Sequence, residues 1–402
     1  MTPARALVVL HVETTSGPQR SLAPRLERLR EQGTELTFLL PAPGPAARWA
    51  AGLGDVRTGI PGAVMLPSGP VQGWRVWRSL EVQRHLTAAA VRDTGAELAL
   101  VSSPTMLGSL RGARRAGAAT LLYCGEVLAR GGIRGLGGKA VGRLGARNAD
   151  AVVAASHVVG GPYRRLGAAV TVVNPPIDAP PGPDELRRLG SAWRAERGLA
   201  PDAPVVASLG AITEGRGQHL LVRALTEAPG SEEPWHLAIG GEAYDRPRDR
   251  AYAAELRELI AALGLSDRVH LLGAVDDPWA LYAGANVFVN PAQVPEGFGR
   301  APCEALAAGC PVVATRVGGV TEALRDGETA LLVDAGSPPA LAGAVARLFG
   351  DAGLARQLTA AGAADAARRL APEAGQPAFE SAVEAALASR RADQSSSAAR
   401  GA

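Results

Sequence analysis

The chain has 402 residues, of which 47% are hydrophobic and 20% charged, a composition that fits a globular protein and excludes a disordered or fibrous one. This length favours two domains over a single core. The formal net charge is +3, but residues 1–178 hold 21 Lys and Arg against 11 Asp and Glu. A basic first half and an acidic second half suit an acidic ligand, an anionic membrane surface or attraction between two domains.

The cysteines and the apolar runs indicate where the protein resides. Cys124, Cys303 and Cys310 match neither a disulfide framework nor the spacing of a zinc site, which favours a reducing compartment. No stretch is long and apolar enough for a transmembrane helix. The apolar run at 6–10 is short and is followed by His11, so we interpret it as a first strand and not as a signal peptide. These features predict a cytoplasmic location.

Apolar runs alternate with helical patterns through the first half of the chain. A helix is predicted over 21–32, because Leu22, Leu26 and Leu29 share one face and Gly33 supplies a stop. The runs between such patterns are short and apolar throughout, so they predict a parallel sheet covered on both faces. The predicted strands are 6–12, 35–40, 63–66, 98–101, 120–123, 151–154 and 170–173.

The segment 174–185 contains five prolines, which is typical of an interdomain linker. The alternation then restarts. We therefore predict a Rossmann-like domain at 1–178, a linker at 179–203, a second Rossmann-like domain at 204–389 and, because its residues are small and polar, a disordered tail at 390–402. The second domain is predicted to contain strands at 205–209, 236–239, 269–272, 287–289 and 311–314 and helices at 217–227, 251–263, 278–283 and 300–308.

The expected fold class is α/β, with two doubly wound domains and a cleft between them. In such domains ligands bind at the carboxyl ends of the strands. Polar and glycine-rich segments that follow predicted strands are therefore the candidate sites.

The stretch from 290 to 320, NPAQVPEGFGRAPCEALAAGCPVVATRVGGV, carries two acids around a glycine-rich turn. Gly297 and Gly299 let backbone N–H groups approach a ligand, and a helix that begins near Arg300 favours an anion at its start. Glu296 and Glu304 can accept hydrogen bonds from sugar hydroxyls, including a ribose diol. The alternative is a surface loop acid and a first-turn acid stabilised by the helix dipole. The glycines and the flanking strands favour a ligand site.

The stretch from 208 to 225, SLGAITEGRGQHLLVRAL, predicts a second ligand-binding turn. Gly210 ends a strand, and Arg216 stands where a helix opens. A cation at a helix start opposes the helix dipole, so we expect Arg216 to face an anion.

Together these motifs resemble the nucleotide-sugar-binding signature of the retaining glycosyltransferases of family 4, which have the GT-B fold. The family pattern is Glu-Gly-Phe-Gly, a second Glu, a Gly-x-Pro-Val-Val strand and a Gly-Gly turn. It occurs here at 296–299, Glu304, 309–313 and 318–319. The resemblance covers roughly residues 5 to 350 and includes the segments AELALVSS, RNADAVVAAS, VTVVNPPID and RVHLLGAVDDPWALYAGANVFVNP.

The resemblance implies a hexosyltransferase that moves a sugar from a nucleotide-diphosphate sugar to an acceptor hydroxyl, with retention of configuration and without a metal. The nucleotide sugar is a co-substrate, and no cofactor is expected. The N-terminal domain would bind a glycan, lipid-linked or small-molecule acceptor. The C-terminal domain would bind the donor sugar through Glu296 and its ribose through Glu304. The donor-binding residues implied are Gly17, Gly210, Arg216, Glu296, Gly297, Phe298, Gly299 and Glu304, and the catalytic residues are Glu296, Arg216 and Glu126.

The chain departs from the family pattern in the turn after Gly210. Ala211 stands where the family has an Arg, and Arg216 stands where it has a Lys, and both family residues contact phosphates. A planar guanidinium replaces a point charge at the second position. The first position loses a phosphate cation. Arg300, where the family is usually apolar, and Arg316 are the candidates to replace it.

Two turns of the N-terminal domain are expected to face the ligands. Gly17 lies in a turn between the first strand and a helix, a geometry that suits the approach of a phosphate. The family has a similar turn that faces the donor. Glu126 stands where family members carry an acidic residue or a His-Asp pair near the acceptor. The alternative for Glu126 is a plain acid at a helix start.

Lys139, Arg143 and Arg147 recur at helical spacing on one face. With Arg130 and Arg134 they form a basic stretch that contains no acid. A solvated helix face is the ordinary interpretation. The alternative is contact with a phosphate-bearing acceptor or an anionic membrane, which would place the protein at the inner face of that membrane.

Missing motifs narrow the alternatives. The sequence has no Asp-x-Asp pair, no Cys/His cluster that indicates a metal, no Gly-x-Gly-x-x-Gly after the first strand and no nucleophile elbow. We expect no nucleic-acid partner. Three other functions stay open: an epimerase or phosphorylase on the same fold, a non-catalytic nucleotide-sugar-binding subunit that the change at Ala211 would explain, and a membrane-docking protein.

Overall fold

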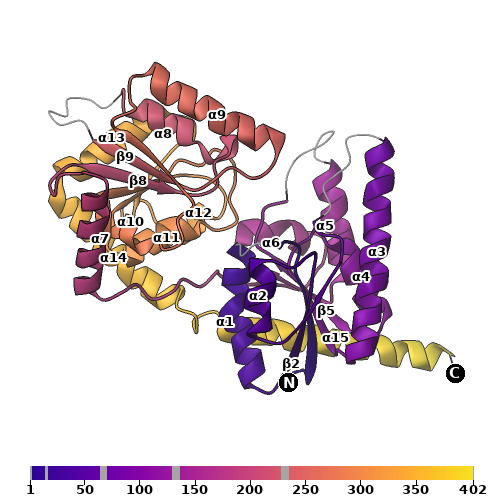
Figure 1. The fold of residues 1–402 in the computed structure, drawn as a ribbon. Coiled ribbons are helices and arrows are strands. Elements are labelled where there is room, and N and C mark those ends of the chain that lie inside the picture. Colours follow the sequence, from indigo (N-terminus) through magenta and orange to yellow (C-terminus); the bar gives the residue numbers. More distant parts are fainter. Residues whose placement is uncertain (1, 14–16, 64–69, 129–135, 228–234, 402) are drawn as a thin grey trace. The chain divides into compact units, whose positions relative to one another are not determined.

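In the computed structural model the chain divides into two compact units (Figure 1). The N-terminal unit is formed by Met1–Pro176 and Pro372–Ala402, and the C-terminal unit by Ile177–Ala371. Each unit contains one parallel β-sheet. The residues that the structure describes are 2–13, 17–63, 70–128, 136–227 and 235–401.

The N-terminal unit is built on a sheet whose inner strands are buried, apart from the exposed first residues of β1 and β2. Its described strands are β1 (Arg5–Val9), β2 (Glu35–Leu40), β3 (Asp55–Thr58), β4 (Leu98–Val101), β5 (Ala119–Cys124), β6 (Ala151–Ala154) and β7 (Val170–Val172). They lie in the order β3-β2-β1-β4-β5-β6-β7, and every neighbouring pair is parallel. Apolar runs such as those of β4 and β6 suit such a sheet because both of their faces are covered.

Helices cover both faces of this sheet. They are α1 (Gly17–Glu31), α2 (Pro45–Ala51), α3 (Pro70–Thr94), α4 (Leu107–Arg115), α5 (Leu136–Asn148), α6 (His157–Arg164) and α15 (Gln376–Gly401). One core lies between the sheet and α1, α2 and α15, and includes the predicted stripe Leu22, Leu26 and Leu29. A second core lies between the opposite face and helices that include α3, α4 and α6.

The C-terminal unit repeats this plan. Its described strands are β8 (Val205–Leu209), β9 (His236–Gly240), β10 (Val269–Gly273), β11 (Val287–Asn290), β12 (Val312–Thr315) and β13 (Leu331–Val333), in the order β10-β9-β8-β11-β12-β13. Its helices are α7 (Pro183–Glu196), α8 (Gln218–Ala224), α9 (Pro247–Ala262), α10 (Trp279–Gly284), α11 (Arg300–Ala307), α12 (Val320–Ala323), α13 (Pro338–Gly350) and α14 (Ala352–Arg369). A short 3-10 turn, η2, spans Glu214–Arg216.

The two sheets share a reversal of strand order, which predicts where ligands bind. In each, the first strand of the unit lies in the middle of the sheet, and the order of the strands reverses beside it. This reversal, the topological switch point, lies between β1 and β4 in the N-terminal unit and between β8 and β11 in the C-terminal unit. Ligands of doubly wound sheets bind outside the carboxyl ends of the strands at this point. The prediction of two doubly wound α/β domains is confirmed.

The predicted linker differs from the structure. Residues 183–196 form α7, which packs closely on α10 because glycines stand at the contact. A Cβ on Gly190 would lie 2.5 Å from the Ala283 carbonyl oxygen, and one on Gly284 would lie 2.5 Å from the Trp193 ring. The prolines thus mark the start of a helix of the C-terminal unit, since proline is well tolerated in a first helical turn.

The predicted C-terminal boundary and disordered tail also differ from the structure. The chain returns to the N-terminal unit at Pro372, and residues 390–401 continue helix α15. Arg25, buried in α1, donates to the Pro372 carbonyl oxygen. Arg390 and Gln394 both donate to the Gly117 carbonyl oxygen, at 3.3 and 3.1 Å. These contacts join residues far apart in the sequence, which a composition-based prediction of disorder does not register.

One predicted strand falls mostly on residues that the structure does not describe. Residues 64–66 of the predicted strand at 63–66 lie outside the described residues, and Ala63 is not in a strand. The described sheet ends at β3, a strand that was not predicted. Its side chains are exposed or half-buried, so its sequence, Asp-Val-Arg-Thr, lacks the apolar run that marks an inner strand.

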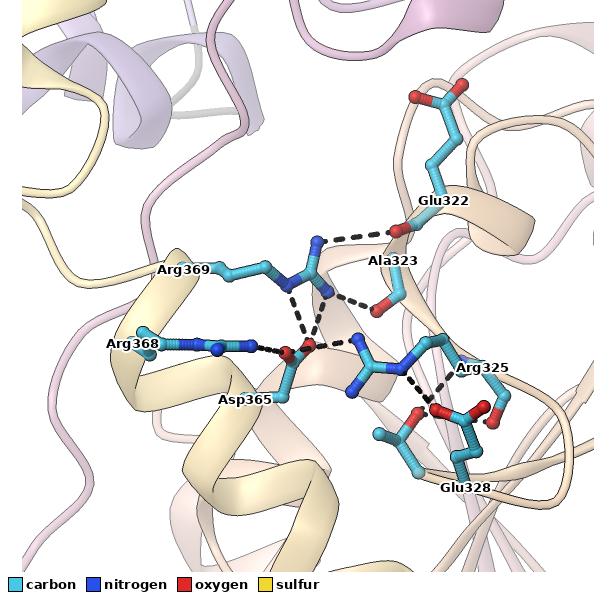
Figure 2. A network of polar contacts seen from close by, with 8 residues as sticks. Glu322, Ala323, Arg325, Glu328, Asp365, Arg368 and Arg369 are labelled. Carbon is cyan, nitrogen blue, oxygen red and sulfur yellow. Dashed lines mark hydrogen bonds and ion pairs between the residues drawn. The ribbon is translucent and has the colours of Figure 1, made fainter.

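A network of ion pairs anchors helix α14 near its end (Figure 2). Asp365 is 5% exposed and accepts hydrogen bonds from Arg325, Arg368 and Arg369, at 3.1, 2.7 and 2.7 Å. Arg369 also donates to the Ala323 carbonyl oxygen at 2.8 Å, at the end of α12. The network therefore joins α14 to the segment that follows the Gly318-Gly319 turn.

Candidate functional site

Glu296 lies at the switch point of the C-terminal unit, in the loop between β11 and α11. Its side chain is largely buried and has two partners at opposite oxygens. Oε1 forms an ion pair with Arg216, and Oε2 accepts a hydrogen bond of 3.3 Å from Asn290 Nδ2. Asn290 is the last residue of β11. The structure thus brings together two residues predicted from separate motifs, Arg216 and Glu296.

A pair of glycines supports the Glu296 loop from behind. The Gly319 N–H donates to the Glu296 carbonyl oxygen at 2.9 Å. A Cβ on Gly318 would lie 2.4 Å from that same oxygen, and one on Gly319 would lie 2.1 Å from the Gly297 carbonyl oxygen. Only glycine permits this approach of two backbones. The Gly-Gly turn of the motif therefore holds the loop in place.

The turn after Glu296 leads directly into helix α11. Gly299 caps the helix with φ of 93°, in the left-handed region that favours glycine. Phe298 is 3% exposed, so its ring belongs to the core. The amides from Gly297 to Gly299 lie at the start of a helix, where the dipole favours an anion.

Glu304 lies on α11 and is buried among polar partners. Its Oε2 accepts a hydrogen bond of 2.9 Å from the Tyr282 hydroxyl, and its Oε1 accepts bonds from Arg300 Nε and Nη2 at 3.3 and 3.0 Å. Burial, followed by the nearby Glu304, raises the pKa of Tyr282 well above its ordinary value, so this hydroxyl stays a neutral donor. Tyr282 was not predicted, because its sequence context, WALYAG, is that of an apolar helix.

Arg216 and Gly210 lie in the turn that follows β8. Gly217 has φ of 73°, and a Cβ there would lie 2.1 Å from the Pro291 carbonyl oxygen. The Gln293 N–H donates to the Gly215 carbonyl oxygen at 2.8 Å. These contacts fasten the turn after β8 to the loop after β11. The Arg216 side chain remains 40% exposed, so part of its guanidinium is open to a ligand.

The structure separates the two candidates for the cation missing at Ala211. Arg316 is engaged elsewhere: it bonds to Asp326 at 2.5 Å and to the Leu332 carbonyl oxygen at 3.0 Å. Arg300 holds Glu304, and its Nη1 is buried without a hydrogen-bond partner among the described residues. Such a group is costly to leave unpaired. Arg300 is therefore the better candidate.

The predicted residues of the N-terminal unit lie at the carboxyl end of its sheet. Gly17 is the first residue of α1, and a Cβ there would meet no atom within 4 Å. Glu126 follows β5, and its side chain is exposed. Neither placement tests the predicted roles.

Sequence reasoning missed a polar pair at the N-terminal switch point. His11 follows β1 and Ser102 follows β4, and both side chains are buried. His11 Nδ1 and Ser102 Oγ are 3.0 Å apart. The available signal was a histidine directly after an apolar strand.

Membrane-spanning helices and metal-binding clusters are both absent from the described residues. No described helix is both long enough and apolar enough to cross a membrane. No cluster of three His, Cys, Asp or Glu side chains suited to a metal ion occurs in the described ranges.

Sequence comparison relates the C-terminal unit to one family. Residues 191–365 match the family model described as Glycosyl transferases group 1. The chain is 36% identical over 241 residues to a D-inositol 3-phosphate glycosyltransferase of Acidothermus cellulolyticus, covering 56% of this chain and 53% of that protein. It is 35% identical over 175 residues to the lipopolysaccharide core biosynthesis glycosyltransferase LpsE of Rhizobium meliloti, covering 44% and 48%. The chain thus matches about half the length of these curated relatives.

Comparison with solved structures covers nearly the whole chain. Anabaena Alr3699/HepE in complex with UDP and glucose superposes with a TM-score of 0.77 at 20% identity, covering 94% of this chain and 99% of that one. Sucrose-phosphate synthase from Thermosynechococcus elongatus gives 0.75 at 21% identity, covering 96% and 99%. At this identity the likeness shows the fold, which is GT-B as predicted. Within it, the segment of the C-terminal unit at 191–365 is the part that is similar to the Glycosyl transferases group 1 model.

Proposed function

We propose that the protein is a hexosyltransferase that moves a sugar from a nucleotide-diphosphate sugar to an acceptor hydroxyl. The observation that carries this proposal is the convergence of Arg216, Glu296 and the start of α11 at one switch point. A cation and helix-end amides suit a diphosphate, while a carboxylate suits sugar hydroxyls. The names of the curated relatives, which are glycosyltransferases, support the same reaction class.

The reaction breaks the bond between the anomeric carbon and a diphosphate oxygen, so negative charge grows on the leaving diphosphate. In the resting structure Glu296 partly neutralises Arg216. A bound donor offers Arg216 a stronger anion and offers Glu296 hydroxyl donors. Arg216 then stabilises the transition state more than the ground state, which is the condition for catalysis.

Transfer with retention of configuration and without a metal is part of this proposal. The resemblance of the 290–320 motif to retaining enzymes supports retention. Arg216 and Arg300 are the two cations that we assign to the diphosphate, with Arg300 replacing the charge missing at Ala211. The Nη1 of Arg300, which has no hydrogen-bond partner within the described part of the chain, supports this assignment. Glu126 would contact the acceptor, and Gly17 would allow the donor phosphates to approach.

The nucleotide is best tested first with UDP sugars. Solved structures of the similar fold of Anabaena Alr3699/HepE contain UDP and UDP-glucose. In a thermal-shift panel of UDP-, GDP- and ADP-sugars, a ligand present at 100 times its Kd stabilises the fold by about 2.7 kcal/mol. We expect at least one of them to raise the Tm. If none does, the donor assignment is wrong.

A non-catalytic nucleotide-sugar-binding subunit is the second candidate, because Ala211 lacks a phosphate cation. Such a subunit would bind a UDP sugar yet release no UDP, with or without acceptors. Product analysis on the same sample also detects an epimerase, which changes the sugar without releasing it, and a phosphorylase, which needs inorganic phosphate.

We also propose that the protein is cytoplasmic and that its N-terminal unit contacts the inner face of an anionic membrane. Such a contact suits a lipid-linked acceptor. Lys139, Arg143 and Arg147 are all exposed on α5, and Leu144 between them is 46% exposed. Arg130 and Arg134 lie outside the described residues. Basic and apolar side chains on one helix suit the surface of an anionic bilayer. Sedimentation with phosphatidylglycerol vesicles but not with phosphatidylcholine vesicles is the expected result, and equal sedimentation would contradict it.

A further inference from the structure

The switch point of the N-terminal unit carries a polar pair that has no role in the proposed donor chemistry. His11 and Ser102 stand at the carboxyl ends of β1 and β4, the two strands between which the strand order reverses. We propose that His11, oriented by Ser102, forms an uncharged site that binds a hydroxyl group of the sugar-like acceptor. This inference rests on the proposed function, since it needs an acceptor to be bound in this unit.

The position of the pair supports a ligand site. Doubly wound sheets bind ligands at the carboxyl ends of the strands beside the switch point. In the C-terminal unit that position holds Asn290 and Glu296, which form the candidate donor site. The order β3-β2-β1-β4-β5-β6 in the N-terminal sheet matches the order β10-β9-β8-β11-β12-β13 in the C-terminal sheet. The corresponding position there holds His11 and Ser102.

The surroundings of His11 are apolar, so a packing role alone explains the residue poorly. Leu7, Val9 and Val101 in the adjoining strands are completely buried. His11 itself is 8% exposed, and Ser102 satisfies only one of its two ring nitrogens. The other, Nε2, has no hydrogen-bond partner among the described residues. An imidazole with one nitrogen fixed and the other unpaired is prepared to bind a further polar group.

The backbone around His11 holds the ring in place. The Ala63 N–H donates to the His11 carbonyl oxygen at 3.2 Å. The segment before Ala63 is braced in turn by the buried Gln83, whose Nε2 donates to the Pro61 and Gly62 carbonyl oxygens at 3.1 Å. A site with fixed groups loses little freedom when it binds a ligand.

The chemistry of the pair selects a neutral partner. Burial lowers the pKa of His11 from 6.5 to about 4, so the ring is uncharged at neutral pH. The side chains after Ser102 are neutral as well: Ser103 Oγ and Thr105 Oγ1 are 2.8 Å apart. An uncharged imidazole can donate to or accept from a hydroxyl but gives a phosphate no charge to bind. A sugar or polyol hydroxyl needs only such a hydrogen-bond partner, so it is the group that the pair suits.

The test observes the His11 side chain directly by NMR of the full chain with isotope-labelled histidine side chains. The probes are methyl α-D-glucopyranoside, methyl α-D-mannopyranoside and myo-inositol, each at about 100 mM because single-sugar sites bind weakly. His11→Gln identifies the His11 signal among six histidines. We expect at least one probe to shift that signal and Ser102→Ala to weaken the response about tenfold. A His11 signal that none of the three probes moves overturns the proposal.

Measuring UDP-glucose on the same samples keeps the two proposals apart. If UDP-glucose raises the Tm but no probe reaches His11, this inference fails alone. If a probe shifts His11 and no nucleotide sugar binds, the hydroxyl site stands, but its assignment to a transferase acceptor fails. A His11 shift caused by UDP-glucose alone places the donor there and overturns the acceptor role. His11→Gln should leave the affinity of the C-terminal unit for UDP-glucose within about twofold. Parent-like hydrogen exchange of β4 at neutral pH shows that the N-terminal unit of the variant is folded.

Discussion

The two switch points share one strand order and differ in charge. In the C-terminal unit, Arg216, Glu296, Arg300 and Glu304 place two cations and two carboxylates around the loops after β8 and β11. In the N-terminal unit, His11 and Ser102 are both neutral. The difference follows from the proposed ligands, because a diphosphate needs cations and an acceptor hydroxyl needs only hydrogen-bond partners. One topology thus supports two chemistries through the residues that follow its strands.

The largest expected effect lies in the charged switch point. Glu296→Ala should lower kcat/KM for a nucleotide sugar about 100-fold or more, roughly 3 kcal/mol, if its hydrogen bonds to the sugar strengthen in the transition state. The fold should survive, because Arg216 is part-exposed and water can solvate it. Steady-state kinetics with the donor of highest affinity checks this.

The matched control for Glu296 is Glu258→Ala, which removes an exposed carboxylate from α9 of the same unit. It should leave the kinetics unchanged. Parent-like turnover by Glu296→Ala would remove the basis for assigning a donor site to the charged switch point.

The neutral switch point should respond to acid. Because the pKa of His11 is lowered from 6.5 to about 4 in the fold, the unfolded chain binds a proton that the folded chain does not. The contribution of His11 to the stability of the fold is therefore fully present above pH 6.5, and it is lost as the pH falls toward 4. Between pH 7 and pH 5 the loss from this residue is about 2 kcal/mol.

Hydrogen exchange of peptides from β1 and β4 measures this loss in the N-terminal unit alone. His219, His236 and His270 also have pKa values lowered by burial, but they lie in the C-terminal unit. In His11→Gln the acid sensitivity of β1 and β4 should diminish about tenfold or more. Equal sensitivity in parent and variant would show that His11 is not a buried neutral group.

Arg216→Ala should have the next largest effect, weakening UDP binding about tenfold in calorimetry, which is about 1.4 kcal/mol. The affinity of Arg216→Lys for UDP should lie between those of the parent and Arg216→Ala, because an ammonium keeps the charge but not the planar fork. Arg300→Ala tests whether Arg300 replaces the charge missing at Ala211, and it should weaken UDP binding further in the double variant. An unchanged affinity in Arg216→Ala would argue against a phosphate role.

Much of the fold could be predicted from the sequence, because inner strands and amphipathic helices have strong apolar patterns. Leu22, Leu26 and Leu29 mark α1 in this way. The misses are elements stabilised by contacts distant in the sequence. Helix α7 begins among prolines and depends on the glycine contacts with α10. Helix α15 packs on the N-terminal sheet through residues such as Phe379, which lies more than 200 residues after β7, the last strand of that sheet.

The candidate site likewise contains residues that the sequence predicted and contacts that it could not predict. Glu296, Glu304 and Arg216 stand in local motifs, so the sequence predicted their proximity to glycine turns. It could not predict that Arg216 pairs with Glu296 or that Tyr282 bonds to Glu304, because these pairs span 80 and 22 residues. His11 carries no motif and was interpreted only as the end of a strand. The pairing of β1 with β4 in the sheet places Ser102 beside His11, and the sequence alone does not show this pairing.

The smallest expected effect concerns the support of the charged switch point. Asp365→Asn should weaken UDP binding only about twofold, because Asp365 acts through Arg369, the end of α12 and the Gly318-Gly319 turn. Stability should fall more, by about 1–3 kcal/mol, since three arginines lose their shared carboxylate. Burial raises the pKa of Asp365, but hydrogen bonds from Arg369, Arg368 and Arg325 outweigh it and hold the pKa below 3.8.

Asp365 therefore stabilises the fold above pH 3.8, and its contribution disappears as the pH falls through the lower pKa of the folded state. The two residues should then act over different ranges, His11 from pH 6.5 to 4 and Asp365 below 3.8. Hydrogen exchange of α14 in the parent and in Asp365→Asn measures the second range. If α14 is equally sensitive to acid in the two proteins, the arginines bind other groups once the pH falls. The Glu296 loop then does not depend on the ion pairs of Asp365.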